Sequence, residues 1–182
     1  NIGISPAKEY LFHIFVTPVG PYYTEDEHPS INLYITDYDR VPANGIGHIK
    51  AAGNYAGGIH VTHDARQQGA DEALYLDPIE HRYFEETNSS NILFCINDTI
   101  ATPDSKAILP SITKDALLTI ASEDLGLSTE YRKIEVSELS NCSEIAVCGT
   151  AVSLVHVHKI KEKETWHEFD IASDNSVFTP LY

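Results

Sequence analysis

The chain has 182 residues, and its 27 acidic and 12 basic side chains give it a formal net charge of −15 at pH 7. Apolar residues make up 42% of the sequence, which is enough for a hydrophobic core and excludes an intrinsically disordered chain. The negative charge argues against nucleic acid and anionic membranes as partners, because clustered lysine and arginine bind both. No apolar run approaches the roughly 20 residues that span a bilayer.

The three cysteines, Cys95, Cys142 and Cys148, show neither a disulfide framework nor the paired spacing of a zinc site. We expect small buried apolar side chains at these positions, and hence a cytoplasmic protein. The chain contains no methionine and begins with Asn1, so we expect it to be part of a longer protein.

The predicted elements are mostly strands. β-Branched and aromatic runs bounded by glycine, proline and polar turns predict them. In chain order they fall at residues 10–17, 31–35, 73–77, 83–86, 92–96, 99–101, 134–136, 145–147, 151–160 and 165–169. Residues 24–30 are expected to form a polar loop and residues 37–47 an irregular segment.

Two helices are predicted among these strands. They cover residues 54–68 and 113–124, and Gly69 and Gly126 follow as expected terminators. Ser111 or Thr113 can cap the second helix. Many strands with two substantial helices define an α+β domain.

Four short motifs place chemistry-bearing residues at turns. Lys50-Ala-Ala-Gly-Asn-Tyr55 follows a glycine-containing turn, and Glu86 to Asn91 ends a strand in a carboxylate and small polar residues. Leu109-Pro-Ser-Ile-Thr113 begins a helix, where free N–H groups can bind an anion. Gly149-Thr-Ala151 joins two strands. Alone, each has an ordinary interpretation: a surface lysine, a hairpin turn, a helix cap and a bend.

Together, in this order and spacing, the motifs resemble those of the branched-chain amino acid aminotransferases, fold-type-IV enzymes that use pyridoxal 5′-phosphate. The resemblance runs from about residue 1 to residue 160. It implies a mixed, largely antiparallel sheet or pseudo-barrel with flanking helices, as in the large domain of these enzymes. Residues 1–182 are then a single cofactor-binding domain, and the family's small N-terminal domain and extreme C-terminus are absent.

The resemblance also implies roles for individual residues. Lys50 is the Schiff-base lysine, expected to be buried between strands so that its amine is neutral, and it moves the proton between Cα and C4′ of the cofactor. Tyr55 hydrogen-bonds the phenolic oxygen of the cofactor. Glu86 keeps the pyridine nitrogen protonated, and strand alternation points the neighbouring Glu85 away.

The remaining expected contacts hold the phosphate and the substrate. The resemblance assigns the phosphate to the N–H groups of Ile112 and Thr113 and to Thr150. It assigns the substrate carboxylate to the N–H groups of Thr150 and Ala151. Arg40 matches a family arginine on the approach to the site and is included as a substrate-binding residue. No metal is expected.

The implied reaction transfers the amino group of leucine, isoleucine or valine to 2-oxoglutarate, so the partners are small amino acids and 2-oxo acids. The family also implies a homodimer for the complete protein. Thr87 departs from the family, because many relatives have glycine there. Two alternatives stay open: a D-amino acid aminotransferase or aminodeoxychorismate lyase of the same fold, and an isolated, inactive fragment of such an enzyme.

Overall fold

A mixed sheet of nine strands organises the part of the chain that the computed structural model describes, which is residues 3–18, 20, 30–169, 171 and 176–181. The strands are β1 (Ser30–Ile35), β2 (Glu72–Leu76), β3 (Phe84–Thr87), β4 (Asn91–Ile96), β5 (Thr99–Pro103), β6 (Ser128–Arg132), β7 (Cys142–Gly149), β8 (Ser153–Glu162) and β9 (Thr165–Glu168). The helical elements are α1 (Ala52–Ala56), α2 (Gly58–Gln67), α3 (Ile112–Thr119), a π-helical turn (Ile120–Asp124) and two 3-10 segments (Val136–Asn141 and Thr179–Leu181).

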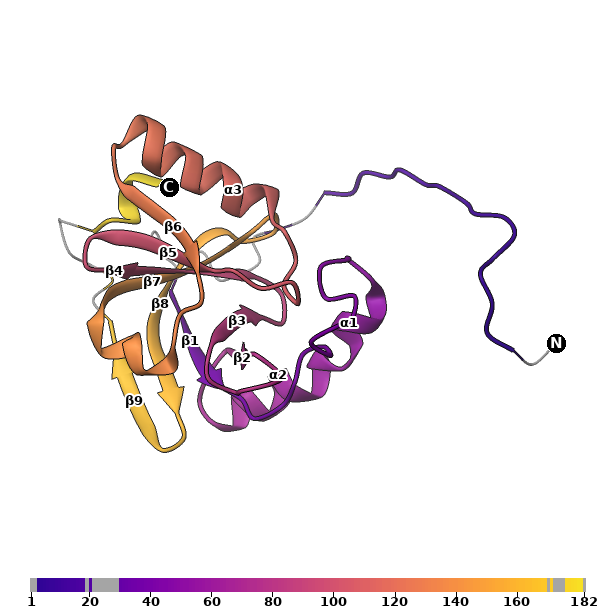
Figure 1. The fold of residues 1–182 in the computed structure, drawn as a ribbon, viewed down its shortest axis with the longest axis horizontal. Coiled ribbons are helices and arrows are strands. Elements are labelled where there is room, and N and C mark those ends of the chain that lie inside the picture. The colour runs from indigo at the N-terminus through magenta and orange to yellow at the C-terminus, as the bar shows by residue number, and fades with distance from the viewer. Residues whose placement is uncertain (1–2, 19, 21–29, 170, 172–175, 182) are drawn as a thin grey trace.

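The spatial order of the strands is β3-β2-β1-β8-β7-β4-β5-β6, with β9 paired to β8. Five of the eight pairs are antiparallel, whereas β1 runs parallel to β2 and β8, and β5 runs parallel to β6. The sheet curls into an open half-barrel with few helices beside it (Figure 1). This confirms the expected α+β fold with a mixed, largely antiparallel sheet.

Apolar side chains pack on both faces of the sheet, and β4 shows why. Its alternate residues Ile92, Phe94 and Ile96 enter one buried cluster, while Leu93 and Cys95 enter the other. The strand is therefore buried along its whole length. The second cluster also takes in helix α3 and the residues near the C-terminus, so these segments cover one face of the sheet.

The turns confirm several predictions from composition. Asn97 and Asp98 both have positive φ, of 50° and 60°, and close the two-residue hairpin between β4 and β5. Gly69 and Gly126 have φ of +83° and +67° after the two predicted helical segments. The left-handed conformation at these positions favours glycine, as expected of helix terminators.

The strand predicted at residues 10–17 is wrong. Residues 3–18 form no strand and extend away from the sheet (Figure 1). The side chains of Tyr10, Phe12 and Phe15 are more than 80% exposed. An extended segment becomes a stable strand only when a neighbour pairs its backbone groups, and no described strand does so here. Of the polar loop expected at 24–30, residues 24–29 lie outside the described residues.

Three further elements differ from prediction. The helix expected at 54–68 is two short helices, α1 and α2, which meet at Gly57. The strand expected at 134–136 is a single bridge between Glu135 and Tyr83, followed by a 3-10 segment. Strand β6 was not predicted, and it pairs in parallel with β5. Within the described ranges, no helix has the length and apolarity needed to cross a membrane.

Candidate active site

A cavity of about 490 Å³ brings the four motifs together. Six of the eight expected site residues line it: Lys50, Tyr55, Glu86, Ile112, Thr150 and Ala151. Thr113 follows Ile112 in the first turn of α3, while Arg40 lies behind Glu86. The cavity wall also includes Asn88, Ser89, Asn91 and Cys148, together with the segment from Leu109 to Ser111. Residues far apart in the sequence thus meet at one cavity.

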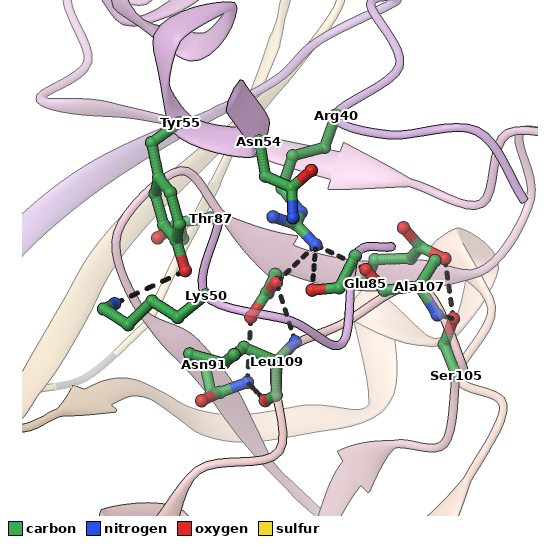
Figure 2. A network of polar contacts seen from close by, with 12 residues as sticks. Arg40, Lys50, Asn54, Tyr55, Glu85, Thr87, Asn91, Ser105, Ala107 and Leu109 are labelled. Atoms are coloured by element: carbon green, nitrogen blue, oxygen red, sulfur yellow. Dashed lines mark hydrogen bonds and ion pairs between the residues drawn. The ribbon is translucent and has the colours of Figure 1, made fainter. Parts of the chain in front are cut away.

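Lys50 lies two residues before α1, in the crossover that the parallel pairing of β1 and β2 requires. Its Nζ is 3.4 Å from the hydroxyl of Tyr55 and 4.6 Å from the centre of the Tyr55 ring (Figure 2). The expectation that Lys50 is buried between strands is wrong, because the residue is exposed on a loop. Its amine is therefore open to a molecule that enters the cavity.

Asn54 holds the loop that carries Lys50. Its Nδ2 donates to the carbonyl oxygens of Ile46 and Ile49, both at 2.8 Å. Asn54 is 9% exposed, so these hydrogen bonds are partly shielded from water. The role of Asn54 was not predicted, and its place inside the Lys50–Tyr55 motif was the available signal.

Gly47 lets the same loop pass against the segment that precedes the third motif. A Cβ atom at this position would lie 1.9 Å from the carbonyl oxygen of Ala107. This distance is far inside van der Waals contact, so any side chain would push the two segments apart. Close backbone approach, rather than a special φ, is the reason for glycine at this position.

Glu86 is fixed on both carboxylate oxygens. Its Oε1 accepts hydrogen bonds from the N–H of Leu109 at 3.0 Å and from Arg40 Nη2 at 2.7 Å. Its Oε2 accepts from Asn91 Nδ2 at 3.0 Å, and the same Nδ2 also donates to the Leu109 carbonyl at 3.0 Å. Glu86 is only 5% exposed, so the carboxylate is held rigidly at the cavity wall.

Burial is the main influence on the ionisation of Glu86, and it raises the pKa of this carboxyl from 4.5 to about 7. The Arg40 charge and the Leu109 N–H act in the opposite direction, while the neighbouring Glu85 raises the pKa further. A desolvated carboxylate of this kind gains from a cationic or N–H partner placed against it in the cavity. Glu86 is therefore suited to hold a protonated ring nitrogen.

Arg40 is not in the position expected for a substrate-binding residue. Its side chain is 1% exposed, and Nη2 donates to the carbonyl oxygens of Gly47 and Ala107 as well as to Glu86 (Figure 2). These contacts tie the Lys50 loop to the Glu86 strand from behind. Arg40 does not line the cavity, so it acts through Glu86 and the loop rather than on an incoming molecule.

The start of α3 offers backbone donors to an anion. Ser111 caps the helix, because its side chain accepts from the N–H of Lys114 at 3.2 Å, as predicted. The N–H groups of Ile112 and Thr113 come before the first intrahelical hydrogen bond and are free to bind a negative group. Ile112 and Thr150 both line the same cavity, so this end of the site can hold a phosphate.

Other reactive groups are excluded by their surroundings. Burial raises the pKa of Cys148, the cysteine on the cavity wall, to about 12, so its thiol is not a nucleophile at neutral pH. No cluster of three or more histidine, cysteine, aspartate or glutamate side chains suited to a metal occurs among the described residues. The wall of the cavity offers an amine from Lys50, a carboxylate from Glu86 and a phenol from Tyr55, and the start of α3 adds backbone donors.

Comparisons with known proteins identify the family of the chain. The family described as Amino-transferase class IV matches residues 2–160. The branched-chain-amino-acid aminotransferase of Helicobacter pylori is 36% identical over 172 residues, which cover 93% of this chain and 51% of that protein. The Arabidopsis thaliana branched-chain-amino-acid aminotransferase 5, named as chloroplastic, is 37% identical over 183 residues. The match covers 100% of this chain and 44% of that protein.

A solved structure leads to the same family. The branched-chain amino acid aminotransferase from Thermobaculum terrenum in its PLP (holo) form superposes with a TM-score of 0.69 at 29% identity, over 74% of this chain and 44% of that one. The chain belongs to the class IV aminotransferases. It spans about half the length of the curated relatives it matches.

Proposed function

We propose that the protein is a pyridoxal 5′-phosphate-dependent aminotransferase that exchanges the amino group between branched-chain L-amino acids and 2-oxoglutarate. The observation that carries the proposal is the single cavity lined by the Lys50 amine, the Glu86 carboxylate and the anion-binding start of α3. The Thermobaculum terrenum relative, solved in its PLP form, and the names of the curated relatives support it.

The residues present fit this cofactor. Glu86 is a desolvated carboxylate that would be stabilised by a protonated ring nitrogen. The N–H groups of Ile112 and Thr113 can take a phosphate. Asn88 also lies on the wall of this cavity.

Each residue then has a definite task. Bound pyridoxal phosphate supplies the electron sink that makes the Cα proton of the amino acid acidic. Lys50 attaches the cofactor through its exposed amine and, when free, carries the proton to and from the substrate. The neighbouring Tyr55 hydroxyl, 3.4 Å away, orients that amine by hydrogen bonding. Glu86 keeps the proton on the ring nitrogen.

The other residues bind and orient. Ile112, Thr113 and Thr150 hold the phosphate, and the N–H groups of Thr150 and Ala151 bind the substrate carboxylate. Arg40, as a positioning residue, favours the ionised form of Glu86 and holds it in place. We also propose that residues 1–182 act as one cofactor-binding domain, and that the complete protein is a cytoplasmic homodimer. Three free cysteines support the cytoplasmic location.

An amino-donor panel tests the proposal. The full-length protein is incubated with pyridoxal phosphate, 2-oxoglutarate and one donor at a time, and glutamate is measured. We expect turnover with L-leucine, L-isoleucine and L-valine and none with the Lys50→Ala variant. Turnover of D-alanine alone would overturn the branched-chain assignment in favour of a D-amino acid aminotransferase. The 182-residue chain is assayed in parallel, and cofactor binding there without turnover of any donor would identify it as an inactive fragment.

A further inference from the structure

A second, smaller cavity of about 310 Å³ lies between the first turn of α3 and the strands β5 and β6. It shares only Pro110 with the Lys50 cavity among the residues that line the two. The hydroxyl of Tyr131, on β6, donates to Asp115 Oδ1, on α3, at 2.8 Å, and this bond joins the two elements at the cavity (Figure 1). None of the proposed chemistry uses this cavity.

The amine of Lys114 has no ionic partner at this cavity. The residue is only 4% exposed, and its Nζ lies 5.1 Å from the centre of the Tyr131 ring. Among the described residues, Nζ forms neither an ion pair nor a hydrogen bond. Buried lysines are almost always paired, because removing the charge from water is costly, and a ring face offsets only part of this cost. A ligand that supplied an anionic oxygen would relieve it.

The Lys114 amine is nevertheless within reach of a small molecule. The polar side-chain atoms that are fully enclosed and lack a partner in the described part of the chain do not include Nζ, so this atom keeps accessible surface. That surface is at the cavity, because Lys114 and the Tyr131 ring beside Nζ both line it. Tyr131 itself is 49% exposed, so a ligand can approach along its ring.

Carboxylates and apolar groups make up the rest of the wall. Asp104 is exposed and accepts no hydrogen bond on its side chain from a described residue, while Asp115 uses only Oδ1, for the Tyr131 hydroxyl. Ile108 and proline rings supply apolar surface. One cation and two carboxylates disfavour a ligand with a single charge, because the aspartates repel an anion and Lys114 repels a cation. A ligand with both charges satisfies both.

We propose that this cavity is a second ligand site that binds a small apolar α-amino acid as a zwitterion. The carboxylate of the ligand accepts from Lys114 Nζ, its ammonium group faces Asp104 and Asp115, and its side chain packs against Ile108. A cavity of about 310 Å³ is large enough for such a molecule and excludes much larger ones. The site is separate from the Lys50 chemistry, so it stands whether or not the proposed transamination does.

The test is a titration of the 182-residue chain with L-leucine, without added pyridoxal phosphate, followed by backbone amide NMR. We expect saturable shifts at Ser105, Lys114 and Tyr131 with a Kd of about 1 mM. Two analogues each carry one of the charges: 4-methylvalerate lacks the ammonium group, and isopentylammonium lacks the carboxylate. Each should bind about tenfold more weakly than L-leucine. Equal binding of either analogue, or shifts confined to the Lys50 cavity, would overturn the proposal.

Two variants separate the charges of the site. Lys114→Met keeps the apolar stem and should weaken L-leucine binding about tenfold while leaving isopentylammonium binding at least as strong. Asp104→Asn, at an exposed residue, should weaken L-leucine and isopentylammonium but not 4-methylvalerate. The control Lys106→Met removes an exposed lysine that does not line the cavity and should leave every Kd unchanged. Unchanged L-leucine affinity in Lys114→Met, or an equal loss of L-leucine and isopentylammonium there, would contradict the assignment.

Discussion

The guanidinium of Arg40 and the carboxylate of Glu86 form an ion pair of 2.7 Å beneath the larger cavity, with side chains only 1% and 6% exposed. Arg40 reaches Glu86 from the irregular segment after β1, and it also donates to the carbonyl oxygens of Gly47 and Ala107. One buried cation thus joins the loop that carries Lys50, the strand that carries Glu86 and the segment that leads to α3. Arg40 therefore holds the walls of the site together without lining the cavity itself.

Replacing Arg40 by methionine should damage both the fold and the site. The substitution leaves the Glu86 carboxylate buried without its counter-charge, which costs about 3–5 kcal/mol in the free energy of unfolding. It should also raise the pKa of Glu86 further. Urea denaturation and an NMR titration of the Glu86 carboxyl measure the two effects.

The matched control is Arg82→Met. Arg82 forms an ion pair of the same length with Glu135, but its side chain is 55% exposed. Water and salt screen this pair, so we expect little change in stability. Equal losses in the two variants would contradict the role assigned to the buried pair.

Glu86 should lower the free energy of unfolding as the pH rises, which is the opposite of the usual effect of a carboxylate. Because its pKa is raised from 4.5 to about 7, the folded chain holds this proton more tightly than the unfolded chain. Ionisation therefore destabilises the fold. The penalty is absent below pH 4.5, grows as the pH rises to about 7, and reaches about 3 kcal/mol in the cofactor-free chain.

Glu86→Gln removes this titration and serves as the reference. As the pH rises from 4.5 to 8, the wild type should lose stability relative to the Glu86→Gln variant, measured as the difference between their free energies of unfolding. Urea denaturation at the two pH values measures it. The same difference at both values would mean that Glu86 is not desolvated in the folded chain.

Asn54→Ala should loosen the Lys50 loop. It removes two partly buried hydrogen bonds of 2.8 Å to the Ile46 and Ile49 carbonyls, and we expect a loss of about 1–3 kcal/mol in the free energy of unfolding. Hydrogen exchange of the loop amides should accelerate as well. Asn44→Ala, at an exposed asparagine of the same segment, should change neither quantity.

Gly47→Ala should separate the two segments that Arg40 joins. The new Cβ would meet the Ala107 carbonyl oxygen at 1.9 Å, so the backbone must move, and overpacking of this kind costs about 1–3 kcal/mol or more. Gly53→Ala is the control, because nothing lies within 4 Å of a Cβ there and alanine favours helix α1. Thermal unfolding should show opposite shifts for the two variants.

Sequence patterns predicted those parts of the fold that depend on local chemistry. The fully buried strand β4, the Asn97–Asp98 turn and the glycines that end the helices all follow from residue type. Strand β6 was missed because its residues Ser128–Arg132 are polar and only partly buried, so no hydrophobic alternation marks them. The segment 10–17 has a strong strand composition, but pairing depends on a neighbour that composition does not reveal.

The site residues, too, could be predicted where local motifs mark them and could not where packing between distant segments decides their position. Four motifs predicted the residues that meet in the larger cavity, because the spacing of the motifs carries the resemblance to the family. The position of Arg40 behind Glu86 could not be read from the sequence, since it depends on how three distant segments pack. The exposure of Lys50 was missed for a similar reason: the glycine-containing turns around it fit a loop as well as a strand end.

The most direct test of the central claim is to find which lysine holds the cofactor. The protein is incubated with pyridoxal phosphate, reduced with borohydride, digested and analysed by mass spectrometry. We predict that the pyridoxyl phosphate label is on Lys50 and not on Lys106 or Lys163, which are also exposed. Labelling of another lysine while Lys50 stays unmodified would contradict the assignment of the cavity as the cofactor site.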